Sequence, residues 1–124
     1  MMTDLPASTR IARATALFLV LVLFTVGSLP AAGQAFPGPM HWVAHFSAYA
    51  LIAFVFALGW PQRSAVTIVI LVAVIGVLQE TSEIITHSHG FETADAVVDA
   101  FGALIGVAIH RLMLMIFFGR SDPR

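Results

Sequence analysis

The chain has 124 residues, of which 59% are hydrophobic and only 10% are charged. Soluble domains are about half apolar and about a quarter charged, so water is a poor solvent for most of this surface and a lipid bilayer is the expected partner. The net charge of −1 gives no electrostatic case for binding nucleic acid. The absence of cysteine excludes disulfides, thiolate metal sites and thiol nucleophiles.

Four apolar stretches follow one another, at about 14–29, 42–60, 64–86 and 94–118. A hydrocarbon core needs roughly 17–25 helical residues, so the last three are long enough to cross it and the first is close to the lower limit. Because apolar and polar residues do not alternate, the stretches predict helices and not barrel strands. The expected fold is all-α, a four-helix transmembrane bundle. Its domain covers 14–118, between an N-terminal tail (1–13) and a C-terminal tail (119–124).

The basic residues predict the topology. They precede the first stretch, lie in the loop after the second, and end or follow the fourth: Arg10, Arg13, Arg63, Arg111, Arg120 and Arg124. The other two loops contain no lysine or arginine. Under the positive-inside rule, both termini and the second loop are cytoplasmic, and the first and third loops lie outside.

The first stretch has a second interpretation. Its basic start, apolar middle and small-residue tail Ala31-Ala32-Gly33-Gln34-Ala35 also fit a secretory signal peptide. Residues 1–35 are therefore either a retained helix or a cleaved leader. The later topology is the same in both cases.

Polar residues interrupt the apolar stretches, and such residues are costly in a membrane and usually functional. Helical residues advance about 100° each, so each polar set shares one helix face. The sets are His41, His45 and Tyr49; Glu80, Glu83 and His87 with Gly76; and Asp95 and Asp99 with Gly102 and Gly106. His45, Glu80 and Asp99 all lie roughly 6–9 Å below the outer boundary. We therefore expect three helices to form one polar cluster on the outer side.

Five of the seven acids lie within a span of twenty residues that contains no lysine or arginine: Glu80, Glu83, Glu92, Asp95 and Asp99. Ionised carboxylates at low dielectric constant need partners, so some should be protonated, paired with histidine or bound to a cation. His45 lies at a similar depth to Glu80, and we predict that these two residues are coupled.

Plainer interpretations accompany these hypotheses. Glu92, Asp95 and His89 lie near helix ends, where side chains can simply reach headgroup water. Asp95 also suits the positive end of a helix dipole. Gly102 and Gly106 form a G-x-x-x-G pattern, which is typical of close helix packing.

The order of the polar residues resembles the VanZ-like membrane proteins over roughly residues 40–112. The matching segments are His45-Phe46-x-x-Tyr49, Glu80-x-x-Glu83 and Asp95-x-x-x-Asp99-x-x-Gly102. The family pattern is His-Phe-x-x-Tyr, Glu-x-x-Gln, an Arg, then Asp-x-x-x-Asn-x-x-Gly. This chain has Glu83 for Gln and Asp99 for Asn, and His89 stands about where the Arg would be. His41-Trp42 replaces an Asp-Lys pair that often precedes the family's histidine.

The resemblance implies a four-helix, multi-pass protein of the bacterial inner membrane. It also implies a role in the cell envelope or in resistance to the glycopeptide teicoplanin, because the family is named for a member linked to that resistance. It supplies no biochemical activity. The departures from the family pattern make the outer cluster of this chain more acidic than that of the family.

Two hypotheses of different class follow. In the preferred one the protein is not an enzyme, and its outer cluster packs the bundle or binds an envelope component. In the alternative, Glu80, Glu83, His87 and His45 bind a divalent metal or act as acid and base on a lipid-linked substrate. No signature such as His-Glu-x-x-His occurs, so the sequence assigns no catalytic residue, metal site or cofactor. Proton-coupled transport is a third hypothesis, because intramembrane acids and histidines form proton relays.

Overall fold

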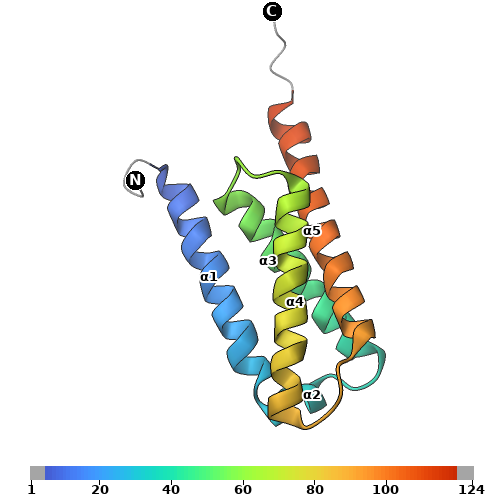
Figure 1. The fold of residues 1–124 in the computed structure, drawn as a ribbon. Helices are drawn as coiled ribbons and strands as arrows, with labels where there is room; N and C mark the ends of the chain where they lie inside the picture. Colours follow the sequence, from blue (N-terminus) through green and yellow to red (C-terminus); the bar gives the residue numbers. More distant parts are fainter. Residues whose placement is uncertain (1–4, 120–124) are drawn as a thin grey trace, which may run out of the picture.

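The computed structural model describes residues 5–119 (Figure 1). Its helices are α1 (Ala7–Gly27), α2 (Pro30–Ala35), α3 (Pro39–Gly59), α4 (Ala65–His87) and α5 (Thr93–Phe118). The described residues contain no strand, which confirms the expected all-α class for them. Four helices, α1, α3, α4 and α5, are long and apolar enough to cross a membrane. Arg120 and Arg124, on which the topology argument partly rests, lie outside the described residues.

Two boundaries differ from the sequence prediction. α1 begins at Ala7, inside the predicted N-terminal tail. Arginine is a good helix former, so Arg10 and Arg13 extend the helix instead of ending it. The predicted first loop contains the short helix α2, which begins with Pro30 at a position that suits proline because no backbone N–H is needed there.

Local signals start and stop the long helices. The Ser64 side chain accepts a hydrogen bond of 3.1 Å from the Thr67 backbone N–H and so caps α4. α4 ends at His87, and the following residue, Ser88, adopts the left-handed conformation with φ of 57°. α3 starts with Pro39 after Gly38, whose φ of 61° favours glycine.

α3 packs against the three other long helices and makes its most extensive contact with α5. Gly102 and Gly106 of α5 lie against the backbone of α3, where a Cβ atom would overlap the carbonyl oxygens of Phe46 and Ala50. The two helices therefore approach more closely than larger side chains would allow. α1 contributes a single buried residue, Ala16.

The bundle has two chemically different ends. At one end the start of α1, the turn between α3 and α4, and the end of α5 lie together (Figure 1). There Arg13 Nε donates to the Gly59 carbonyl (2.7 Å) and Arg111 Nη2 donates to the Arg63 carbonyl (3.0 Å). We call this the arginine end. At the opposite end lie α2 and the loop between α4 and α5, beside the polar residues described next. We call that the acidic end.

Candidate functional site

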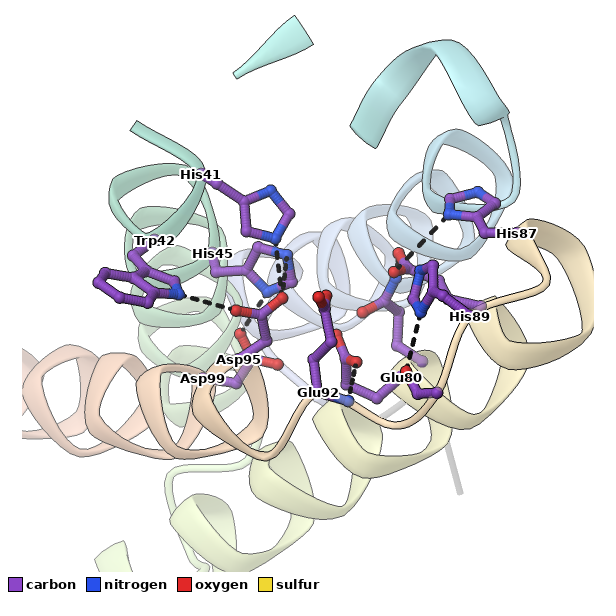
Figure 2. A network of polar contacts seen from close by, with 12 residues as sticks. His41, Trp42, His45, Glu80, His87, His89, Glu92, Asp95 and Asp99 are labelled. Carbon is purple, nitrogen blue, oxygen red and sulfur yellow. Dashed lines mark hydrogen bonds and ion pairs between the residues drawn. The ribbon is translucent and has the colours of Figure 1, made fainter. Parts of the chain in front are cut away.

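Asp95 joins the start of α5 to the start of α3 (Figure 2). Its Oδ1 accepts a hydrogen bond of 2.9 Å from the indole Nε1–H of Trp42, and its Oδ2 lies 2.8 Å from His41 Nε2. An ionised carboxylate can only accept, so His41 donates when Asp95 is charged. Asp95 is also in the first turn of α5, where the helix dipole favours a negative charge.

His45 forms the second link between α3 and α5. Its Nδ1 lies 2.8 Å from Asp99 Oδ1, and its Nε2 lies 3.9 Å from Asp95 Oδ2. The ring therefore stands between two carboxylates and is within hydrogen-bonding distance of Asp99 alone. Asp99 is fully buried, so the imidazole replaces part of the hydration that this carboxylate has lost.

Tyr49 and Asp99 are packed against α4 at Gly76. A Cβ atom built on Gly76 would lie 3.0 Å from Asp99 Oδ2 and 3.3 Å from Tyr49 Cε1. The missing side chain thus makes room for polar groups of two other helices. The Tyr49 hydroxyl and Asp99 Oδ2 are buried and have no hydrogen-bond partner among the described residues.

The inner face of α4 carries two further acids, Glu80 and Glu83. Gln79 Nε2 donates to Glu83 Oε1, and Glu83 Oε2 lies 4.0 Å from His87 Nδ1 one turn further on. Glu80 is fully buried, and its Oε2 accepts a long hydrogen bond of 3.4 Å from the Glu92 backbone N–H. Three buried atoms of this face lack a partner in the described part of the chain: Gln79 Oε1, Glu80 Oε1 and His87 Nε2.

A cavity of about 280 Å³ lies between α1, α3 and α4. Most of its wall is apolar, with Leu19, Leu23, Val26, Ala44, Ala48 and Ile52 among the lining residues. Its polar lining consists of His41, His45, Tyr49, Gln79 and Glu83.

A groove of about 1010 Å³ lies at the acidic end itself. It runs between the segment 30–39, the end of α4 and the start of α5, and its polar lining includes His87, His89, Glu92 and Asp95. His89 lies in the loop beyond the end of α4, and the hydrogen bond between its Nδ1 and the Gly90 carbonyl raises the pKa of the imidazole. Gly33, Phe36, His41 and Glu83 line both spaces, so the apolar cavity and the more polar groove are neighbours.

The structure places the sequence-predicted residues in two groups. His45, Tyr49, Asp95 and Asp99 lie between α3 and α5, and Glu80, Glu83 and His87 lie on α4. The partner of His45 differs from the predicted one, because its hydrogen bond goes to Asp99 and not to Glu80. The hypothetical ligand set Glu80, Glu83, His87 and His45 is therefore divided. Within 4.8 Å the structure instead brings together His41, His45 and Asp95; Glu83, His87 and His89; and Glu80, Glu92 and Asp95.

Sequence reasoning missed two residues of this site and one beyond it. Gln79 lies one helical turn before Glu83, and this spacing could have indicated that their side chains are in contact. Trp42 is half-exposed and belongs to an apolar stretch of the sequence. Only its indole N–H, a hydrogen-bond donor, could have indicated that it contacts an acid. His110 is buried on α5 toward the arginine end, where it packs edge-on against Phe54.

Comparisons with family models, curated proteins and solved structures find no match to this chain.

Proposed function

We propose that this chain is a multi-pass protein of the bacterial inner membrane whose acidic end binds an amphiphilic component of the cell envelope. The arginine end lies in the cytoplasm and the acidic end outside. The observation that carries the proposal is the junction of the two spaces, since an apolar cavity of about 280 Å³ meets a polar groove of about 1010 Å³ at shared lining residues.

The sizes and surfaces suit a lipid-like ligand. Small-molecule sites usually measure roughly 300–1,000 Å³ and combine apolar walls with a few polar groups. An alkyl or isoprenyl chain fits the apolar wall that α1 and α3 form. The head group then lies in the groove, beside His41 and Glu83, which line both spaces.

The polar lining also restricts the head group. Carboxylates and the unpartnered Gln79 Oε1 are acceptors, so a ligand must bring hydrogen-bond donors to them. A head group that carries hydroxyl or amino groups satisfies this need. A bare anionic head group meets an excess of carboxylates and is disfavoured. The ligand class is therefore a glycosylated or amino-bearing lipid of the envelope.

The resemblance to the VanZ-like family supports the same cellular setting. Of its matched residues, the four with polar side chains, His45, Tyr49, Glu80 and Asp95, belong to the acidic end. A link to glycopeptide resistance is a hypothesis from that resemblance alone. A glycopeptide susceptibility profile of a deletion strain, complemented with Glu80→Gln, tests it.

Filling the cavity tests the binding proposal. Ala48 lines the cavity, so Ala48→Phe places a ring where the lipid chain is proposed to lie. The protein is purified in a mild detergent, and retained lipids are measured by native mass spectrometry. We expect the retained amphiphile to fall by at least about tenfold, which corresponds to roughly 1.4 kcal/mol of binding free energy.

Ala108→Phe is the matched control, because Ala108 is exposed on α5 and lines neither space. This variant should retain as much amphiphile as the parent protein. Equal retention by both variants, or the absence of any specifically retained lipid from the parent, would overturn the proposal.

A further inference from the structure

Three carboxylates from different segments converge at the start of α5. Glu80 comes from α4, Glu92 immediately precedes α5, and Asp95 lies in its first turn. One oxygen atom of each lies within 4.8 Å of the others. Figure 2 shows the three side chains beside one another between α4 and α5.

Within residues 5–119, no arginine forms an ion pair with these carboxylates. The sequence contains no lysine, and it has no arginine between Arg63 and Arg111. In the described part of the chain, Arg13, Arg63 and Arg111 make their contacts at the opposite end of the bundle. His41 and Trp42 donate to Asp95 only, and within residues 5–119 neither Glu80 nor Glu92 forms an ion pair.

An orphaned atom points independently to a ligand. Glu80 is fully buried, yet its Oε1 has no hydrogen-bond partner within residues 5–119. Its Oε2 receives one long hydrogen bond, 3.4 Å from the Glu92 backbone nitrogen. A carboxylate has about four acceptor positions, so most of those on Glu80 are unused.

We propose that Glu80, Glu92 and Asp95 form a binding site for a hard divalent cation of the Ca²⁺ class. All three ligand atoms are oxygens, which Ca²⁺, Mg²⁺ and Mn²⁺ prefer, and there is no soft ligand to favour copper or zinc. Oxygens on opposite sides of a Ca²⁺ ion are up to about 5 Å apart, because each Ca–O bond is about 2.3–2.6 Å. The three ligand atoms lie within 4.8 Å of one another, which fits that limit. They come from α4, from the loop before α5 and from α5 itself, and oxygens from separate segments suit the flexible shell of Ca²⁺ better than the near-ideal octahedron that Mg²⁺ demands.

The position of the site indicates what the cation does. Glu92 and Asp95 line the groove, so an ion can enter from that side and complete its shell with water. Bound there, it ties α4 to the start of α5 across the loop 88–92. This inference is independent of the proposed amphiphile, because it concerns the protein in detergent without added lipid.

Terbium luminescence tests the site directly. Tb³⁺ replaces Ca²⁺ at oxygen sites, and its emission is sensitised by a nearby tryptophan. Trp42 Nε1 lies 2.9 Å from Asp95 Oδ1, whereas Trp60 packs on Arg13 at the opposite end. We expect saturable Tb³⁺ emission that Ca²⁺ displaces more effectively than Mg²⁺. Emission should be lost in Trp42→Phe and kept in Trp60→Phe.

Glu92→Gln is the decisive ligand variant, because Glu92 is exposed and its replacement does not threaten folding. We expect it to weaken Ca²⁺ competition by about tenfold or more, and Glu80→Gln to do the same or worse. Thr81→Val, which alters an exposed polar residue of the same helix that lines neither space, should bind as the parent does. The proposal is overturned if the parent shows no saturable emission, or if Glu92→Gln binds Ca²⁺ with unchanged affinity.

Discussion

The two histidine–aspartate links between α3 and α5 are unequal in burial. His41 is partly exposed, whereas His45 and Asp99 are both largely withdrawn from solvent and lie 2.8 Å apart. Removing one partner of such a pair leaves the other buried without its hydrogen bond, which is more costly than losing both together. His45→Ala and Asp99→Ala should therefore each destabilise the protein, and the double variant should be little worse than either one. The coupling free energy expected from a double-mutant cycle is about 0.5–3 kcal/mol.

His110 supplies the control for this cycle. It is buried on α5, eleven positions after Asp99, which corresponds to roughly 16 Å along the helix. His110→Phe combined with Asp99→Ala should show additive losses within about 0.5 kcal/mol. Denaturation by SDS in mixed micelles measures both cycles. Additive losses for His45 and Asp99 would show that their hydrogen bond does not link the helices energetically.

The partner of His45 marks the limit of what helix periodicity predicts. Periodicity correctly indicates that His45, Glu80 and Asp99 face inward, because that depends on spacing within one helix. Which acid His45 meets depends on how close each neighbouring helix comes. Gly102 and Gly106 let α5 lie directly on α3, so Asp99 takes the position that sequence reasoning assigns to Glu80.

At the scale of elements, the glycines of α5 determine how the bundle packs. A single methyl group at Gly106 would overlap the Ala50 carbonyl, which is backbone and cannot move out of the way like a side chain. Gly106→Ala should therefore push α5 away from α3 and cost about 1–3 kcal/mol of unfolding free energy, as overpacking usually does. The shift in the thermal midpoint in detergent measures the loss.

Gly33→Ala is the matched change, because a Cβ atom at this position in α2 meets nothing within 4 Å. It should leave the thermal midpoint unchanged or raise it slightly, since alanine has less chain entropy to lose than glycine. If Gly106→Ala were as harmless as Gly33→Ala, the close approach of α3 and α5 would not be important for stability.

The elements also show why some boundaries are predictable and others are not. Proline and glycine mark the start of α3, and the serine cap marks the start of α4, because these residues act locally. The start of α1 is different. Hydropathy places the start of α1 after Arg13, but the helix already includes Arg13. The Arg13 guanidinium contacts the Gly59 carbonyl and the Trp60 ring at the end of α3. A window of apolar residues cannot detect that contact.

For the whole molecule, the arginine distribution predicts that the arginine end faces the cytoplasm. The chain has no cysteine, so single cysteines report topology without background labelling. Pro37→Cys lies at the acidic end and Gln62→Cys at the arginine end, both exposed. A membrane-impermeant maleimide should label Pro37→Cys in intact cells and Gln62→Cys only after permeabilisation. The reverse labelling pattern would show that the orientation is opposite to the proposed one.

The slight burial of α1 has a mechanical consequence. About 6% of its spanning window is buried, compared with 28–39% for the other three helices. We therefore expect α1 to have the lowest free energy of local opening among the four long helices. In a bilayer, α1 would open by moving sideways away from the bundle and would stay helical, because a helix in lipid keeps its own backbone hydrogen bonds. α1 forms one wall of the cavity, so such a displacement would open the cavity toward the acyl chains of the bilayer.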